Sequence, residues 1–492
     1  MQPDPDRAPR TGVWFRADLR VRDHAALLEA ARQGDVTCVF CLDPREREPS
    51  RLRSLPRWSP WRGRFLVEAL ADLRQELRAL GGELLVRRGR PEEVLPRLAA
   101  SEGWNALHAH ELVGTEERRV ERAVREALPD TCRLRTFWDR TLLAPEELPF
   151  GIGEIPEVFT RFRKAVEAAG SYDAPLPAPD SLRRATPGGT SEPGELPTVE
   201  ELGADPPRDD DRAVLRFCGG ETAGLERLAA YLWREDRLRT YKETRNGMVG
   251  AAYSSKLSPW LALGCVTART VQAEIERYEE ERVRNRSTYW LTFELLWRDY
   301  FQWIARRHGA SLFAAAGLQG TRRPWRHETA SFEAWRQGAT GIPLVDANMR
   351  ELDRSGFLSN RGRQIVASFL TKNLGIDWRW GAEWFEARLV DYDVASNWGN
   401  WAYAAGVGND ARGFRYFDVA TQAAKYDRRG RHARLWCPEL AALPDANVHA
   451  PWELSRAQQE ALDWVLGRDW PTPLVDLDES VAEQRARWDR WA

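Results

Sequence analysis

The sequence predicts a two-domain protein, in which an α/β domain built on a doubly wound parallel sheet precedes an all-helical domain. Two patterns support this fold class. Over the first 140 residues, short apolar runs alternate with a helical pattern, whereas from about Ala213 onward the apolar spacing is almost purely helical. The length agrees, because 492 residues are several times the size of a typical domain and imply at least two hydrophobic cores.

The predicted sheet consists of short buried strands. Four apolar runs have this character: Gly12–Phe15, Val36–Leu42, Glu83–Val86 and Ala106–His108. Between the second and third runs, apolar residues recur every 3.6 positions over Arg64–Leu80 and two glycines follow, which predicts a helix and its end. Ligands of such sheets bind at the carboxyl ends of the strands. The sequence contains no GxGxxG or Walker A loop, so nothing supports an ordinary dinucleotide or P-loop site.

A proline-rich segment separates the two predicted domains. Residues 170–207 contain eight prolines among Gly, Ser, Thr and Asp, a composition typical of a linker that wraps across a surface. Helices are predicted at Gly224–Arg237, Thr267–Arg282, Tyr289–Arg307, Phe332–Gln337, Val345–Ser355, Gly362–Leu374 and Ala382–Leu389. The predicted boundaries are 11–150 for the α/β domain, 151–212 for the linker, 213–475 for the helical domain and 476–492 for a C-terminal tail.

Composition excludes several classes of protein. Lys plus Arg (72) nearly balance Asp plus Glu (74), so the chain is not a wholly basic nucleic-acid coat, although a local basic face remains open. No apolar stretch reaches the length of a membrane span, and Met1–Arg10 is too polar for a secretory signal. The expected compartment is the cytoplasm, without membrane attachment.

Cysteine and histidine offer no metal centre, whereas tryptophan is unusually abundant. Cys38 and Cys41 have the only close cysteine spacing, and they lie in an apolar run where both are expected to be core residues. No metal site is predicted. The chain has 23 tryptophans, and 18 of them lie from Trp233 onward. Packing is the default role of aromatic residues, but such crowding in one half calls for a further explanation.

Two segments of the helical half have the residue types of a phosphate site. Tyr241–Arg245 and Ser254–Pro259 bring short hydroxyls together with Arg245 and Lys256 just before a helix, and Ser258 with Pro259 suits the N-cap and first helical position. Backbone N–H groups, hydroxyls and cations of this kind can hold a phosphate. A well-capped helix beside a solvated basic loop is the alternative interpretation.

Two further segments suit a polar heterocycle. Asn360–Arg363 and Asp391–Trp401 are separated by enough chain to face each other, so Arg363 can pair with Asp391. Asp393 and Asn397 then offer hydrogen bonds to a flavin-like ring in an apolar pocket. A buried ion pair with an asparagine turn is the alternative.

One helical segment places a carboxylate beside an aromatic ring and a cation. Glu294, Trp297 and Arg298 lie at positions i, i+3 and i+4, hence on one side of the helix. This combination suits recognition of a flipped, stacked base, but without further context ordinary amphipathic helix packing is the favoured interpretation.

Several long motifs together resemble the photolyase/cryptochrome family. The stretch Trp14–Arg20 resembles the start of the family's α/β domain, and Ser254–Pro259, Trp335–Arg350 and Asp391–Trp401 resemble its flavin-domain signatures. Four blocks resemble the cryptochrome DASH branch in particular: Pro156–Lys164, Tyr241–Ser255, Asn360–Phe369 and 401–410. The resemblance runs from about residue 12 to residue 436. It implies a photolyase-type α/β antenna domain followed by a helical FAD-binding domain.

The resemblance implies FAD in the helical domain and the folate antenna 5,10-methenyltetrahydrofolate on the α/β domain. Family positions around the FAD phosphates fall on Tyr241, Ser254, Ser255, Leu257 and Ser258. Those around the flavin ring fall on Arg363 and Asp391 as an ion pair, Asp393 as a ring contact and Asn397 near N5. The antenna glutamate aligns with Leu112, and Glu111 takes that role if the loop shifts by one residue.

The resemblance also implies light-driven chemistry. The electron-transfer positions fall on Trp401, Trp378 and Trp325, from the flavin outward, which explains part of the tryptophan surplus. The pocket for a cyclobutane pyrimidine dimer falls on Glu294, Trp297, Asn360, Gln364 and Tyr403. Glu294 is expected to stabilise the charged dimer by hydrogen bonding. The branch is associated mainly with dimers in single-stranded DNA, and Arg298, Arg361 and Arg412 are candidates for a basic groove.

Two alternative functions remain open at this stage. The main prediction is a FAD-dependent cryptochrome DASH that repairs dimers in single-stranded DNA as a monomer. A photoreceptor that signals without productive repair is the first alternative, and the dimer-pocket residues argue against it. The second is a flavoprotein without a light function, in which the three electron-transfer tryptophans are dispensable for photoreduction.

Overall fold

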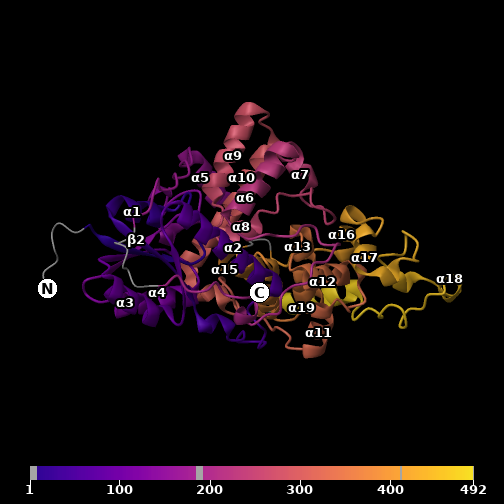
Figure 1. Cartoon of the computed structure of the whole chain (residues 1–492). Coiled ribbons are helices and arrows are strands. Elements are labelled where there is room, and N and C mark those ends of the chain that lie inside the picture. The colour runs from indigo at the N-terminus through magenta and orange to yellow at the C-terminus, as the bar shows by residue number, and fades with distance from the viewer. Residues whose placement is uncertain (1–7, 184–191, 410–412, 491–492) are drawn as a thin grey trace.

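The five-stranded parallel sheet of the α/β domain forms the N-terminal part of the molecule (Figure 1). The computed structural model describes residues 8–183, 192–409 and 413–490. The strand order is β3-β2-β1-β4-β5. Strand bounds are Arg10–Phe15 (β1), Asp35–Leu42 (β2), Leu84–Arg88 (β3), Ala106–His110 (β4) and Arg133–Phe137 (β5). The four predicted strands are present, and sequence reasoning missed β5.

Helices cover both faces of this sheet, which makes it doubly wound. Val13 of β1 packs in one core, with helices α1 and α2, while its neighbour Trp14 packs in a second core, with α3 and α4. This alternation follows from the period of two along a strand. Cys38 and Cys41 of β2 likewise belong to opposite cores, as the sequence suggested. The helices are α1 (Ala25–Gln33), α2 (Pro60–Ala79), α3 (Pro91–Glu102) and α4 (Thr115–Ala127).

In the described part of the segment 151–212, one α-helix and two short 3-10 turns interrupt an otherwise extended chain. Helix α5 (Phe159–Ala169) packs on the helical domain. Farther along, the backbone N–H of Val86 in β3 donates to the carbonyl of Pro193, and that of Val36 donates to the carbonyl of Arg183. The segment therefore covers backbone groups at the edge of the sheet.

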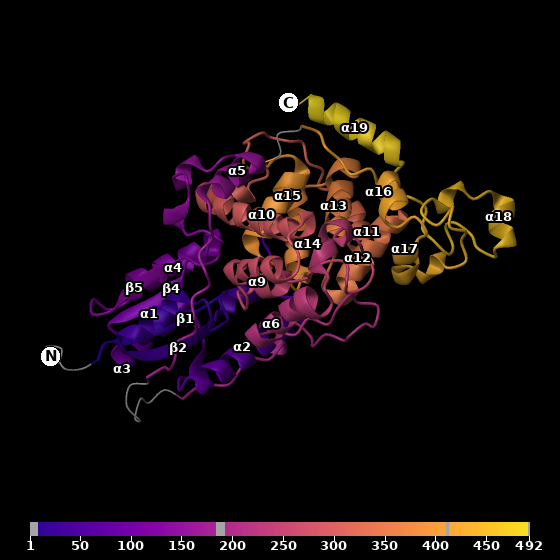
Figure 2. The same cartoon turned by 90° about the horizontal axis from the view of Figure 1, so that it is seen from above.

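The second half of the molecule is helical, and Figure 2 shows these helices grouped beside the sheet. Two predicted helices, Gly224–Arg237 and Gly362–Leu374, each end in a π-helical turn, at Ala230–Arg234 and Phe369–Asn373. No described helix is long and apolar enough to cross a membrane. The helices are α6 (Glu221–Ala229), α7 (Tyr241–Thr244), α8 (Ser258–Ala262), α9 (Ala268–Glu281), α10 (Arg286–His308), α11 (Thr329–Gln337), α12 (Pro343–Ser355), α13 (Asn360–Ser368), α14 (Trp378–Arg388), α15 (Val394–Ala405), α16 (Val419–Tyr426), α17 (Arg431–Trp436), α18 (Arg456–Ala461) and α19 (Leu477–Asp489).

Buried polar contacts join the two halves. The carboxylate of Glu383 on α14 accepts hydrogen bonds from the Ser50 hydroxyl (2.6 Å) and from the backbone N–H groups of Leu52 (3.0 Å) and Arg53 (2.9 Å). Asp23 pairs with Arg269 at 2.6 Å, and both side chains are largely buried. Such charge-assisted contacts fix the orientation of the helical domain against the sheet.

Candidate functional site

The predicted ion pair between α13 and the segment before α15 is present. Arg363 Nη2 lies 2.8 Å from one oxygen of Asp391 and 3.0 Å from the other. The Arg363 Nε–H donates to the carbonyl of Leu358 at 2.9 Å, which fixes the plane of the guanidinium. Only 2% of the Asp391 side chain is exposed, against 26% for Arg363. The pair therefore presents its cation outward from a buried carboxylate.

Asn397 on α15 has a buried oxygen that lacks a hydrogen-bond partner. Its Nδ2 donates to the carbonyl of Ala382 at 3.0 Å, which orients the amide, while Oδ1 has no partner among the described residues. A buried acceptor without a donor costs about 1–3 kcal/mol, so its presence favours a bound group that supplies an N–H.

Asp393 has a structural role in addition to the one predicted for it. Its carboxylate caps α15 through the Ser396 N–H (2.8 Å), pairs with Arg140 (3.1 Å) and accepts from Gln302 Nε2 (2.9 Å). Burial raises the pKa of this carboxyl, but Arg140 and Arg298 more than offset that effect, so the pKa lies below the ordinary value. Asp393 thus ties the flavin-domain helix to the α/β domain, and its contact with the flavin ring stays a prediction.

The predicted phosphate segment differs from expectation in two respects. Leu257 and not Ser258 is the N-cap of α8, and no side chain caps this helix, because Ser258 already has helical geometry. Lys256 is not a free cation. Its left-handed backbone (φ 56°) turns the side chain inward, where Nζ donates to the Ala251 carbonyl at 2.9 Å and lies 3.3 Å from the centre of the Tyr253 ring. Neighbouring Ser254 and Ser255 are half-buried and buried.

Arg245 and Tyr241, the other members of the predicted phosphate region, lie next to the dimer-pocket residues. Arg245 is paired with Glu294 at 2.5 Å, which places it beside the predicted dimer pocket. Burial raises the pKa of the Glu294 carboxyl above its ordinary value, and Arg245 acts against that rise. Tyr241 on α7 is buried, and burial with the nearby Glu294 charge raises the pKa of its phenol.

The three predicted electron-transfer tryptophans lie in sequence from the core to the surface. Trp401 is one helical turn from Asn397 on α15, and its ring rests on Gly381 of α14, where an added Cβ would lie 2.2 Å from the ring. One turn back along α14, Trp378 is fully buried and donates from Nε1 to the carbonyl of Ala315 at 3.3 Å. Trp325, partly exposed, donates to the same carbonyl at 3.1 Å.

The predicted dimer pocket gathers side chains from three helices. Trp297 of α10 stacks on Phe159 of α5 with ring centroids 3.7 Å apart, and Tyr403 of α15 meets it edge-on at 5.7 Å. Asn360, exposed, begins α13, and Gln364 one turn later keeps a buried oxygen without a partner among the described residues. The Phe159 ring, which supports Trp297 from within the predicted linker, was missed because its distance along the chain gave no signal.

The three candidate cations of the basic groove have different outcomes. The prediction of Arg298 as a groove residue is wrong. Its guanidinium donates to the carbonyls of Arg140 (2.5 Å) and Leu261 (3.3 Å) and is therefore held at the domain junction. Arg361 donates to Asn246 Oδ1 at 2.9 Å near the pocket. Burial lowers the pKa of Arg361, and the positive charges of Arg245 and Arg415 lower it further, so these three cations form one cluster. Arg412 lies outside the described residues.

The antenna position contains an ion pair between the domains. Glu111, directly after β4, lies 3.1 Å from Arg306 of α10. The Arg306 guanidinium lies 4.6 Å from the centre of the Trp138 ring, which itself stacks on Trp303 at 4.6 Å. Burial raises the pKa of the Glu111 carboxyl. Its neighbour Leu112 has no polar atom to offer, so Glu111 is the acidic side chain at this site.

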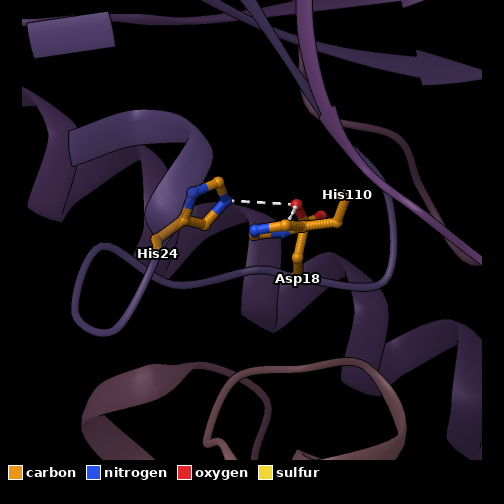
Figure 3. A group of neighbouring side chains, drawn as sticks. All are labelled: Asp18, His24 and His110. Carbon is orange, nitrogen blue, oxygen red and sulfur yellow. Dashed lines mark hydrogen bonds and ion pairs between the residues drawn. The ribbon is translucent and has the colours of Figure 1, made fainter. Parts of the chain in front are cut away.

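One buried group has the residue types of a metal site, Asp18, His24 and His110 (Figure 3). Asp18 Oδ2 lies 3.1 Å from His24 Nε2 and 2.6 Å from His110 Nδ1, while His24 Nδ1 accepts from the N–H of Leu27. His110 Nε2 is 2.7 Å from Asp139. Burial lowers the pKa of the His110 ring, but the two carboxylates more than offset this and raise it. In this arrangement the Asp18 carboxylate contacts both imidazole rings, and Asp139 lies beside the second ring.

Taken together, the sheet, the helical domain, the Arg363–Asp391 pair and the tryptophan series define a photolyase-type flavoprotein. The model for the FAD-binding domain of DNA photolyase matches residues 290–490, and the model for DNA photolyase matches residues 11–180. A cryptochrome DASH of Gloeobacter violaceus is 54% identical over 476 residues, 96% of this chain and 94% of that protein.

Solved structures agree with this result. A cryptochrome crystal structure from Synechocystis is 48% identical and superposes with a TM-score of 0.94, covering 99% of this chain and all of the other. A class III photolyase from Agrobacterium tumefaciens is 28% identical with a TM-score of 0.83, covering 100% of this chain and 99% of its own. The chain belongs to the cryptochrome DASH family, and it contains the FAD-binding domain of the photolyases.

Proposed function

We propose that the protein is a blue-light-driven lyase of the deoxyribodipyrimidine photolyase type, which splits cyclobutane pyrimidine dimers in single-stranded DNA. The observation that carries the proposal is the pocket at α10, where Glu294 with its partner Arg245 lies on the same helical face as Trp297, and Trp297 meets Tyr403. A carboxylate beside aromatic walls suits a flipped, stacked pyrimidine pair.

The residues expected around FAD fit that cofactor. Asn397 has the buried, partnerless oxygen that a ring N–H would satisfy, and Arg363 presents a cation fixed by Asp391. The serines at 254, 255 and 258 and the Leu257 backbone are proposed to face the FAD phosphates, with Tyr241 beside them. Bound there, reduced FAD would supply the light-driven one-electron chemistry that splits the dimer.

The chain's own residues keep the cofactor supplied with electrons. Trp401, buried between Gly381 and Asn397, is proposed to be the inner donor, because indole is a readily oxidised side chain. Trp378 then refills Trp401, and Trp325, the partly exposed member, exchanges with reductant in solution. Their shared hydrogen-bond acceptor, the carbonyl of Ala315, holds the outer two rings in place.

Substrate is bound and stabilised by the pocket residues. Glu294 is proposed to hydrogen-bond the dimer while it carries the extra charge, an effect that is strong in a site with little water. Trp297 and Tyr403 form the walls, and Asn360 and Gln364 contact the base edges. Arg361 and Arg415, with Arg245, are proposed to bind backbone phosphates at the rim.

Three finer features belong to the same proposal. Single-stranded DNA is preferred because flipping a dimer out of a duplex costs a few kcal/mol that the pocket does not recover. Glu111 is proposed to hold 5,10-methenyltetrahydrofolate between the domains. The protein is proposed to act as a monomer in the cytoplasm.

The test is light-dependent repair of a single-stranded oligonucleotide that carries one dimer, followed by chromatography. Wild type is expected to repair it only under blue light, and Glu294→Ala is expected to lose about tenfold to a hundredfold in rate. Glu126→Ala, on exposed α4, is the matched control and should repair normally. Equal rates for the Glu294 variant and wild type would contradict the assigned pocket. Absence of repair by wild type, with FAD bound and reduced by light, would favour the photoreceptor alternative.

A further inference from the structure

The exposed side of α10 is a stripe rich in aromatic side chains. Along the middle of this helix the positions that are not fully buried are 289, 290, 293, 294, 297 and 298, which follow the helical spacing of one face. Four of them are large rings: Tyr289, Trp290, Phe293 and Trp297. These half-buried rings lie in a row on a helix whose remaining residues are mostly buried, so each leaves part of its surface accessible on the same face.

These rings form a continuous series that ends in the dimer pocket. Trp290 stacks on Phe293 with centroids 4.6 Å apart, Phe293 meets Phe159 edge-on at 5.3 Å, and Phe159 stacks on Trp297 at 3.7 Å. Trp290 is also one turn before Glu294, the pocket carboxylate. We call Trp290, Phe293, Phe159 and Trp297 the aromatic track.

Cations line the outer end of the track. Lys242 Nζ lies 4.4 Å from the centre of the Trp290 ring, and the Arg286 guanidinium lies 5.9 Å from it. Arg163 lies 5.6 Å from the centre of Phe293. Within the described ranges, neither Lys242 nor Arg286 makes an ion pair with a carboxylate. Glu243 offsets part of their charge, but no short ion pair among the described residues holds either cation away from an anionic partner.

We infer that the aromatic track binds unpaired nucleotides on one side of the dimer, and this inference rests on the proposed function. Base faces stack on the partly exposed rings, and Lys242 and Arg286 neutralise the neighbouring phosphates, the combination that single-stranded nucleic acid requires. In a duplex the flanking bases are already stacked and paired, so they reach the rings only after unpairing. The track thus adds binding energy for single strands alone. This gain would explain why the protein prefers single-stranded over duplex DNA.

Trp290 is the residue to change, because it ends the series of ring contacts and is the ring that both Lys242 and Arg286 approach. Its matched control is Trp233, a partly exposed tryptophan that is likewise covered by cations, Arg277 at 4.2 Å and Arg282 at 5.2 Å. Among the described residues, no ring contact joins Trp233 to the track. Fluorescence anisotropy would measure binding of undamaged single-stranded and duplex oligonucleotides of equal length to the FAD-loaded protein.

Trp290→Ala is expected to weaken single-strand binding about tenfold and to change duplex binding less than about twofold. Trp290→Phe, which keeps a stacking face, should recover most of the loss, and Trp233→Ala should match wild type. Lys242→Ala is expected to make the plot of log affinity against log salt concentration less steep for single strands, by the amount that about one lost phosphate contact produces. Equal single-strand affinities for Trp290→Ala and Trp233→Ala would overturn the inference.

Failure of the inference and failure of the proposed function give different results. If wild type repairs dimers but its single-strand affinity does not depend on Trp290, the track is refuted and repair stands. If single-strand binding depends on Trp290 but no dimer is repaired, the track stands as a nucleic-acid site and the lyase proposal is refuted.

Discussion

Replacing Lys256 with methionine is expected to remove a pH dependence of stability in the helical domain. Only 3% of Lys256 is exposed, and its ammonium group has one hydrogen-bond acceptor, the Ala251 carbonyl, and the face of Tyr253. Burial, with a smaller contribution from Arg227, lowers the pKa of Lys256 from 10.5 to about 7. A methionine of similar length fills the same space without requiring a charge to be desolvated.

The sign and size of the effect follow from proton linkage. Between pH 7 and about 10.5 the unfolded chain keeps the Lys256 proton while the folded chain has released it, so folding stability rises with pH in this window. Below pH 7 both states hold the proton, and the contribution of Lys256 is constant. With a folded pKa of about 7, wild type should gain about 2 kcal/mol between pH 7 and 9 relative to Lys256→Met.

Urea unfolding of the FAD-loaded protein at pH 7, 8 and 9 measures this difference, as the change in midpoint multiplied by the common slope. The control is Lys425→Met, which removes an exposed lysine that also lies over a tyrosine ring, Tyr426 at 5.3 Å. The midpoint of wild type should approach or pass that of Lys256→Met as the pH rises, while Lys425→Met runs parallel to wild type. Parallel profiles for wild type and Lys256→Met would refute the reasoning.

Three further changes test other parts of the structure. Trp378→Phe should preserve packing but abolish rapid photoreduction of FAD, measured by absorbance under blue light with an external reductant. The control is Trp398→Phe, which changes a buried neighbour whose ring lies 5.7 Å away and should retain photoreduction. Photoreduction at the normal rate in Trp378→Phe would exclude this residue as an electron carrier. Gly381→Ala places a methyl group 2.2 Å from the Trp401 ring and should destabilise the folded protein by about 1–3 kcal/mol. Its thermal midpoint should lie below that of the control Gly153→Ala, where an added Cβ meets nothing within 4 Å. Equal midpoints would show that Trp401 can move aside. Glu383→Gln replaces a carboxylate that accepts three hydrogen bonds and should lower the free energy of unfolding by about 1.5–3 kcal/mol. The control Glu126→Gln, at an exposed position of α4, should leave the thermal midpoint unchanged. An unchanged midpoint in Glu383→Gln would argue against its role at the domain junction.

Strongly patterned features of the fold could be predicted from sequence. The four predicted strands, β1 to β4, are largely buried apolar runs, which makes them visible without an alignment. The fifth strand, Arg133–Phe137, lies at the sheet edge and alternates exposed arginines with apolar residues, so its signal is weak. The π-helical turns at the ends of two helices have no sequence pattern distinct from that of an α-helix.

The candidate site was predictable where a motif fixes its own local geometry. Arg363 and Asp391 pair as expected, because Arg363 lies in the first turn of α13 and Asp391 lies in the turn that leads into α15. Lys256 was assigned to a phosphate on charge alone. Its own backbone is left-handed, and this conformation turns its side chain into the core. Arg298 shares a helical face with Glu294, but the carbonyls that accept its hydrogen bonds come from distant parts of the chain. The Arg245–Glu294 pair and the support of Trp297 by Phe159 depend on tertiary packing, which spacing does not encode.

The measurement that tests the central claim most directly is the rate of blue-light repair of one cyclobutane dimer, presented by the same sequence as a single strand and as a duplex. The FAD-loaded protein is expected to repair the single strand rapidly and the duplex at least about tenfold more slowly, because the duplex must first release the dimer at a cost of a few kcal/mol. Equal rates on both substrates would contradict the strand preference. Repair of neither, while light still reduces the bound FAD, would contradict the lyase function itself.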